Sequence, residues 1–360
     1  MMTFSEPKSL TKTTLTFALV IAVLILLFSY FLAIFLGPIL MFSSDGLAAI
    51  YKNLQPPILL FIVIGFIAPV NINVGWTFLI LWGVFAICFV AALRLREPFH
   101  NAIEKGFSGS VGKLFDNWLF AMPVITSMML VAVLAIHLFQ ESQGIPTGDI
   151  QLPSNRFESL FELSYAALIE EIGFRITPIG AFLIIHTFLA EKRNERTLSL
   201  RQRLKLFFAA PLFPDEAKEM VGMKTVSNFG VRGGISIGEW AMVFLTSIVF
   251  GLAHYLSGGG WEIGKATSAS AVGVAMGLTY LLYGVQAPIL LHWFFNYYTY
   301  ALSFASELYS TVFITSVLAD LVTIVLGVLG WLTIPVLALL RIFRARSRKA
   351  ETELSLLQVS

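Results

Sequence analysis

The sequence predicts an all-α fold, a polytopic transmembrane helical bundle with about 8–9 spans. Two observations predict it. Of the 360 residues, 57% are hydrophobic and 13% are charged, with a mean hydropathy of +0.81, whereas soluble domains carry about 25% charged residues. A crossing needs about 20 predominantly apolar residues, and apolar runs near this length recur along the chain. They lie at 14–40, 57–70, 75–93, 119–139, 160–190, 238–256, 266–283, 286–304 and 312–340.

The runs at 57–70 and 75–93 allow two topologies. The first run is short, and the sequence Asn-Ile-Asn-Val-Gly at 71–75 is typical of a turn. Two crossings give nine spans with the N-terminus outside, whereas one broken crossing over 57–93 gives eight spans with both ends inside. The later helices keep the same orientation in both topologies.

Basic residues predict which segments are cytoplasmic. Lys and Arg are enriched in cytoplasmic loops, and here they gather after the third apolar run, after the fifth and after the last. We therefore expect these three segments, the C-terminus included, to be cytoplasmic. The residues are Arg94, Arg96, Lys105, Lys113, Lys192, Arg193, Arg196, Arg201, Arg203, Lys205, Arg341, Arg344, Arg346, Arg348 and Lys349.

One sizeable loop, at 191–236, lies outside the predicted spans. Its stretch 198–209 interleaves Leu and Phe with Lys and Arg. This pattern is consistent with a helix on an anionic membrane surface or with an ordinary basic loop. The formal charge of +2 is too small to indicate nucleic-acid binding. A lone cysteine, Cys88, excludes a disulfide or a cysteine-based metal cluster within one chain.

Charged residues inside apolar runs are costly and predict functional sites. The first group is Glu-Glu-Ile-Gly-Phe-Arg at 170–175. On a helix Glu171 and Arg175 share a face and can pair. Glu170 points about 100° away, toward a cavity or another helix, and is the candidate general base. The alternative is a structural ion-pair cluster. Pro178 predicts a kink just past the group.

Two further groups lie on later apolar runs. Phe-Gly-Leu-Ala-His at 250–254 contains small residues that permit close helix approach. In His-Trp-Phe-Phe-Asn at 292–296, His292 and Asn296 lie one above the other and can donate hydrogen bonds into one cavity. Taken alone, each group also fits a hydrogen-bonded packing residue or an interhelical clamp. Asp320, deep in the last run, is a candidate structural partner for another helix.

In this order on separate apolar helices, the motifs Glu-Glu-x-x-x-Arg, Phe-x-x-x-His and His-x-x-x-Asn resemble the CAAX protease and bacteriocin-processing family. Its members are intramembrane peptidases related to the CAAX prenyl endopeptidases. The matching residues are Glu170, Glu171, Arg175, Phe250, His254, His292 and Asn296. The resemblance implies N-terminal transmembrane helices at 1–117 that vary within the family. It further implies a protease core at 118–305 that includes the basic loop, and a C-terminal transmembrane helix with a basic tail at 306–360.

The resemblance implies a glutamic-type endopeptidase without a metal or other cofactor. By motif position, Glu170 with His254 would activate a water, while His292 and Asn296 would stabilise the oxyanion. Glu171 and Arg175 would support this geometry. The implied partners are membrane-associated peptides or proteins and the lipid bilayer. The second motif, followed by Tyr255, is closer to prokaryotic members than to the histidine-rich eukaryotic version, which implies a prokaryotic cell membrane.

Two other classes of function remain open at this stage. Glu170, His254 and His292 are a legitimate ligand set for a zinc-dependent peptidase, although the sequence contains no His-Glu-x-x-His motif. Intramembrane Glu, His and Asp also build proton relays, so the same residues fit an ion-coupled transporter, or the packing of a membrane scaffold or immunity protein. The sequence has no inverted repeat of the kind that transporter folds often show.

Overall fold

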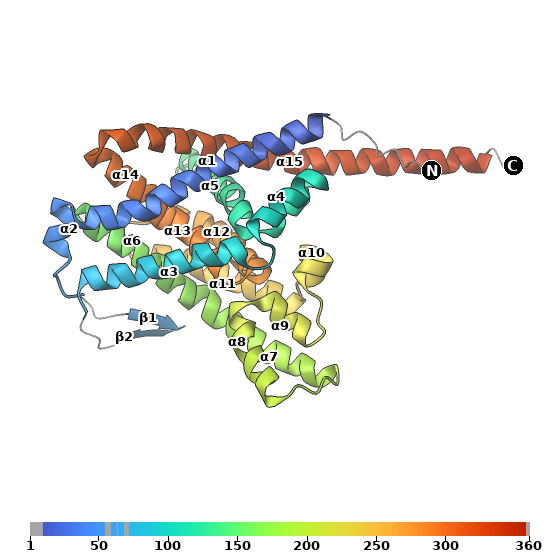
Figure 1. Ribbon diagram of the computed structural model, residues 1–360, viewed down its shortest axis with the longest axis horizontal. Coiled ribbons are helices and arrows are strands. Elements are labelled where there is room, and N and C mark those ends of the chain that lie inside the picture. The colour runs from blue at the N-terminus through green and yellow to red at the C-terminus, as the bar shows by residue number, and fades with distance from the viewer. Residues whose placement is uncertain (1–9, 55–58, 63, 68–71, 358–360) are drawn as a thin grey trace.

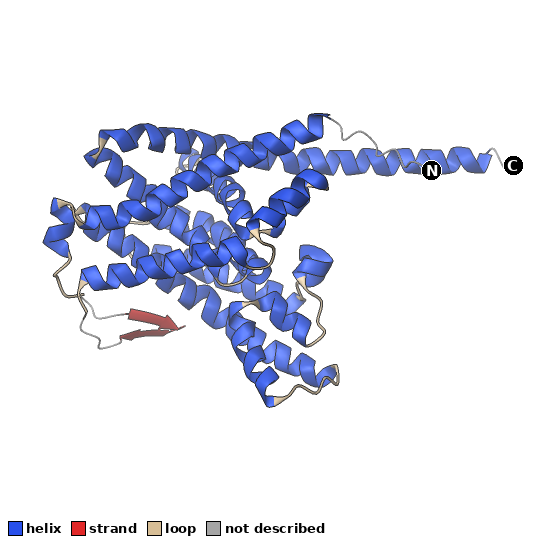
Figure 2. Cartoon of the chain, in the orientation of Figure 1, coloured by secondary structure: helices blue, strands red, loops and turns tan. Residues whose placement is uncertain are grey.

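The computed structural model of the protein describes residues 10–54, 59–62, 64–67 and 72–357. It is a bundle of long helices with one small hairpin beside it (Figures 1 and 2). Seven helices in the described residues are long and apolar enough to cross a membrane. The predicted all-α polytopic bundle is therefore confirmed. The seven are Thr13–Met41, Val74–Ser108, Trp118–Ser142, Arg156–Arg193, Ile237–Leu256, Ile263–Tyr283 and Ser310–Val336.

The elements of the first half begin with a long N-terminal helix. They are α1 (Leu10–Met41), α2 (Ser44–Ala49), β1 (Leu59–Ile62), β2 (Ile64–Ile67), α3 (Val74–Arg94), α4 (Phe99–Ser108), the 3₁₀ helix η1 (Val111–Asp116), α5 (Trp118–Ser142), α6 (Arg156–Glu171) and the π-helical turn η2 (Ile172–Ile176).

The second half adds three short peripheral helices and five longer segments. The elements are α7 (Thr177–Arg193), α8 (Leu200–Leu212), α9 (Pro214–Met220), α10 (Val226–Gly234), α11 (Ile237–Leu256), α12 (Ile263–Tyr283), α13 (Gln286–Trp293), the π-helical turn η3 (Phe294–Tyr298), α14 (Thr299–Leu308) and α15 (Ser310–Leu357).

The loops gather at two opposite ends of the bundle. At one end, which we call the basic end, Arg96 donates to the carbonyl of Leu282 across 3.0 Å and the Val285 amide donates to Leu212. At the other end, the pocket end, residues 146–151 bond to residues 259–264. These contacts lie at the two termini of α12, whose 21 residues span roughly 30 Å at 1.5 Å per residue.

The described ends of the chain lie on the same side of the bundle (Figure 1). In Figure 1, α1 begins and α15 ends on the side of α4 and α10, which belong to the basic end, whereas α2 and the turn from α14 to α15 lie on the opposite side. A chain whose two ends lie on the same side of a membrane crosses it an even number of times. The arrangement fits the eight-span topology, in which the segment from α13 through η3 to α14 is added to the seven candidates. That segment contains the predicted span at 286–304 and is not among the seven.

The apolar run at 57–70 is not a helix where the structure describes it. Residues 59–62 and 64–67 are antiparallel strands, with Leu59 opposite Ile67; the other residues of this run lie outside the described part. The run is shorter than the about 20 residues that a crossing needs, and its Ile and Phe residues favour strands. Between 57 and 93 the described chain has one candidate crossing, α3, which favours the eight-span alternative over the nine-span one.

The core is built around α13, which packs against α3, α5, α6 and α12. Trp293 is completely buried, and its ring centroid lies 5.0 Å from that of Phe89 in an edge-on contact. Tyr30 of α1 meets Tyr298 in the same way at 4.6 Å. Because such aromatic pairs add to the free energy gained from burial, α13 is held in a fixed position. The third polar motif begins on this helix.

A second, smaller hydrophobic cluster joins α7 to α8 and α9, with Leu183, Leu206 and Tyr280 fully buried. α8 corresponds to the interleaved stretch predicted at 198–209. It buries Leu206 against this cluster but leaves Leu204, Phe207 and Phe208 exposed. A helix that exposes apolar and basic side chains together fits the membrane-surface alternative, which stays a prediction.

Candidate active site

The first polar motif lies where α6 passes into the π-helical turn η2. The side chains of Glu171 and Arg175 are completely buried, and Arg175 Nη1 donates to Glu171 Oε1 across 3.0 Å. This is the pairing that the four-residue spacing predicts. A buried charge needs a compensating partner, since removing one member of such a pair leaves the other uncompensated. The pair is therefore a structural anchor beneath the site.

Phe250 connects the first two motifs. Its ring centroid lies 3.9 Å from the guanidinium carbon of Arg175, which is well within cation–π range. The same ring lies 4.6 Å from that of His254 and 5.9 Å from that of His292, centroid to centroid. On another side of this cation, α12 approaches closely at Gly273, because a Cβ added there would lie 3.0 Å from Arg175 Nη2. The phenylalanine of the second motif thus contacts the buried cation and both imidazoles.

His292 lies between the two adjacent glutamates. Its Nδ1 is 2.8 Å from Glu171 Oε1, and its Nε2 is 3.7 Å from Glu170 Oε2. A carboxylate can only accept, so Nδ1 is the donor in the shorter contact. The Glu170 side chain is 31% exposed, whereas that of Glu171 is fully buried. The two glutamates therefore have different surroundings: Glu171 is fixed by two partners, and Glu170 faces open space.

His254 and Asn296 are each oriented by a backbone carbonyl. His254 Nδ1 lies 3.0 Å from the carbonyl of Phe250, and Asn296 Nδ2 donates to the carbonyl of Leu163 across 3.3 Å. Since a carbonyl only accepts, Nδ1 of His254 carries the proton and Nε2 is left as an acceptor. This is the tautomer whose Nε2 can accept a hydrogen bond from a water.

A pocket of about 430 Å³ brings these side chains together, with Glu170, His254 and Asn296 in its wall. A smaller cavity of about 70 Å³ is lined by His254, His292 and Asn296. Of the six residues predicted for the site, four therefore face these two cavities. The other two, Glu171 and Arg175, lie behind them. The rim of the larger pocket comes from residues 150–152 and 257–261 at the pocket end.

Two of the three motifs contain a π-helical turn. In η2 the amide of Thr177 donates to the carbonyl of Ile172, five residues back, and in η3 the amide of Thr299 donates to Phe294. Such turns are rare and often occur at functional sites. Pro178, from which a kink is predicted, lies two residues beyond η2, in the first turn of α7, and lacks the amide hydrogen that a regular helix would use.

Two other polar residues of the apolar helices lie away from this arrangement. His137 Nε2 is 2.8 Å from Ser268 Oγ, and Asp320 is exposed on α15. Neither lines the two cavities. Within the described residues, no group of three His, Cys, Asp or Glu side chains is arranged to hold a metal ion.

Lys265 is a pocket residue that the motif analysis missed. It lies in the first turn of α12 and lines both cavities. No sequence spacing connects it to the three motifs. The one sequence feature that could have indicated a role for Lys265 is its position, since it is a lone lysine at the start of an apolar run.

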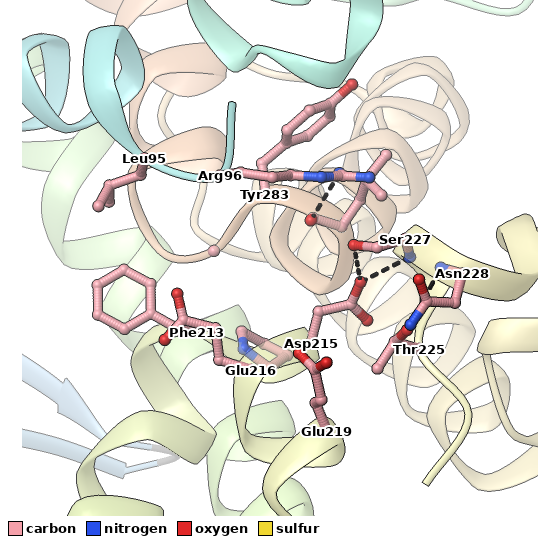
Figure 3. A pocket seen from close by; sticks show the side chains of 13 residues that line it. Leu95, Arg96, Phe213, Asp215, Glu216, Glu219, Thr225, Ser227, Asn228 and Tyr283 are labelled. Carbon is pink, nitrogen blue, oxygen red and sulfur yellow. Dashed lines mark hydrogen bonds between the residues drawn. The ribbon is translucent and has the colours of Figure 1, made fainter. Parts of the chain in front are cut away.

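A separate pocket of about 190 Å³ lies at the basic end (Figure 3). Arg96 lies over the ring of Tyr283, 5.1 Å from its centroid. Asp215 accepts from the amides of Val226 and Ser227 and from the Ser227 hydroxyl. These polar groups are already engaged in turns and caps, and none belongs to the three motifs. This pocket is distinct from the candidate active site at the other end of α12.

The fold and the two cavities define a class: an integral membrane protein that holds a carboxylate, two imidazoles and an amide around a pocket within its helices. Residues 154–298 match the family described as type II CAAX prenyl endopeptidase Rce1-like. This segment is similar to that family of CAAX proteases, and the similarity supports a membrane-embedded protease. All seven motif residues fall within the matched segment. No curated protein and no solved structure gives a significant match.

Proposed function

We propose that the protein is a glutamic-type intramembrane endopeptidase that cleaves membrane-associated peptides or proteins. The observation that carries the proposal is the shared pocket, whose wall contains Glu170, His254 and Asn296. Glu170 is the one member of the adjacent glutamates with exposed surface, so it is the carboxylate that can reach a water. Its neighbour Glu171 is occupied by Arg175 and His292.

In the proposed reaction Glu170 removes a proton from a water while the water oxygen attacks the scissile carbonyl carbon. His254 accepts a hydrogen bond from the same water through Nε2, because its Nδ1 is engaged with the Phe250 carbonyl. Collapse of the tetrahedral intermediate breaks the C–N bond, and Glu170 passes its proton to the leaving amine. A general base of this kind contributes about 10²–10⁴-fold to the rate.

The developing oxyanion needs donors that are already in place. Asn296 offers its amide hydrogens, and His292, when protonated on Nε2, offers a second donor. Glu171 holds the His292 ring by its Nδ1 at 2.8 Å, and Arg175 in turn holds Glu171. We therefore assign to Glu171 and Arg175 the role of positioning the His292 ring. We further propose that the catalytic core extends from about residue 118 to about residue 305.

The metal content of active protein distinguishes this mechanism from a zinc-dependent one. The purified protein is stripped with a chelator, and elemental analysis checks that no stoichiometric zinc remains. Its substrate is a quenched fluorescent peptide that the untreated protein cleaves. We expect the stripped protein to cleave this peptide at an unchanged rate. The reason is that a carboxylate base needs no metal-bound hydroxide. Loss of cleavage on stripping, restored by one equivalent of zinc, would establish Glu170, His254 and His292 as ligands instead.

We further propose that the pocket opens on the non-cytoplasmic side of a prokaryotic cell membrane. Lys52 is the one basic residue of the pocket-end loops at 42–54, 143–155 and 257–262, whereas the loops at 95–117 and 194–236 are rich in Lys and Arg. The positive-inside rule then makes the basic end and the C-terminus cytoplasmic. A substrate would reach Glu170 from the outer face of the membrane.

The single cysteine allows a direct test of this orientation. Cys88 is buried, so a Cys88→Ser background accepts one reporter cysteine at a time. We expect Gln143→Cys, at the pocket end, to react with a membrane-impermeant maleimide on intact cells. We expect Glu219→Cys, at the basic end, to react only after the cells are permeabilised. Both positions are exposed, and the reverse labelling pattern would refute the orientation.

A further inference from the structure

Lys265 is the one lysine or arginine in the wall of the larger pocket. It shares this wall with Glu170, and it shares the smaller cavity with His292 and Asn296. It is half-buried, in the first turn of α12, just behind the glycine-rich rim at 258–260. An ammonium here is within the space that a bound peptide would fill.

The other basic side chains near the pocket end are engaged with carboxylates. Lys52 pairs with Glu158, and Arg156 pairs with Asp45 and Glu307. Lys265 differs, because among the described residues its Nζ forms no ion pair. Its contact is the ring of Trp261, whose centroid lies 3.8 Å away. A cation held over an aromatic face keeps its hydrogen-bond donors available to a third group.

The rest of the larger pocket has an uneven chemistry. Leu152, Leu163, Ala166 and Phe295 give it apolar surface, and Glu162 and Glu170 give it negative charge. A carboxylate that enters such a pocket is repelled by these two glutamates and attracted by an ammonium. Lys265 is the one lysine or arginine of the described wall, so it offers an anionic substrate group a full opposite charge.

We propose that Lys265 is a specificity-determining residue that binds a substrate carboxylate in the same pocket as the catalytic groups. The carboxylate is either the free C-terminus of the peptide or an Asp or Glu side chain, since both present the same chemistry to an ammonium. The proposal rests on the proposed peptidase function. Trp261 fixes the direction of the lysine, and the substrate completes its ion pair.

The competing role for Lys265 is structural. In that role the ammonium only balances the charge of Glu162 and Glu170, or only packs against Trp261. Either role would make a lysine variant slower on all peptides. The proposed role makes it slower only on peptides that carry the recognised carboxylate, and this difference provides the test.

The experiment compares matched quenched peptides in phosphatidylcholine vesicles, which carry no net charge. One pair differs only in a C-terminal carboxylate or carboxamide, and a second pair has Glu or Gln beside the cleaved bond. The pair that responds identifies which of the two carboxylates Lys265 binds. In that pair, we expect Lys265→Met to lower kcat/KM on the anionic peptide about 10-fold or more, which corresponds to the loss of one charge-assisted hydrogen bond. Cleavage of its neutral partner should change less than about 2-fold.

Lys265→Arg should retain the preference for the anionic member, because it keeps the charge and the aromatic contact. Lys52→Met is the matched control: Lys52 is exposed, lies at the same end and does not line the pocket, so its preference should equal that of wild type. An unchanged preference in Lys265→Met, or an equal loss on all four peptides, would overturn the proposal. Failure of wild type to cleave any peptide would instead overturn the peptidase function itself.

Discussion

Glu170→Gln is expected to abolish proteolysis, lowering kcat by about 10³-fold or more, while the protein still inserts and folds. The glutamine has nearly the same size and can keep a polar contact with His292, but it cannot take a proton from water. The loss should therefore fall on the chemical step, within the range for general-base catalysis. Because Glu170 is partly exposed and forms no ion pair with Arg175, the folded state loses little.

The measurement is cleavage-product mass spectrometry on membranes from cells that express wild type or variant at equal levels, followed by single-turnover rates on the purified proteins. Glu158→Gln is the control, since it makes the same change on the same helix at a surface ion pair with Lys52. It should cleave like wild type. Turnover by Glu170→Gln within about 10-fold of wild type would exclude Glu170 as the base.

Arg175→Met is expected to destabilise the folded protein by about 3–5 kcal/mol, the usual cost of stranding a buried charge. It removes the cation that faces Glu171 and lies over Phe250. Activity should also fall, because Glu171 would no longer hold His292 at its Nδ1. The measurement is the thermal unfolding midpoint in detergent, together with the cleavage rate well below that temperature.

Two further variants separate stability from positioning. Glu171→Gln combined with Arg175→Met removes both charges and should recover part of the stability without recovering activity, because a neutral amide oxygen holds the His292 ring less strongly than the carboxylate does. Lys113→Met removes an exposed pair with Asp116, whose loss should cost about 0–1 kcal/mol. If Arg175→Met proved as stable as Lys113→Met, the buried pair would not be the anchor described here.

Local geometry explains which parts of the site the sequence predicts. The four-residue spacing of Glu171 and Arg175 predicts their pairing, and the 100° step to Glu170 predicts that the two glutamates face different surroundings. Both features belong to one helix. The meeting of Glu170 with His292, which is over one hundred residues away, could be expected only from the resemblance. Periodicity alone does not fix which distant helices meet.

Other features depend on tertiary context. A run of Leu, Ile and Phe at 59–67 suits a buried helix as well as a strand, and the structure forms a hairpin there. The hydrogen-bond shift in η2 leaves no mark on the sequence beyond the nearby Pro178. Lys265 carries no spacing signal, so its relevance depends on the pocket that α12 helps to form.

The π-helical turn η2 divides one continuous helix between two hydrophobic cores. Before it, α6 contributes Phe157 and Leu160 to the main core around α13; after it, α7 contributes Ile179 and Leu183 to the smaller cluster with α8. A π turn adds a residue to the helix and so rotates everything beyond it relative to a regular helix. Arg175 lies within this turn and Glu171 directly before it. Rearrangement of the outer cluster would therefore be transmitted along the backbone to the residues that hold His292 in place.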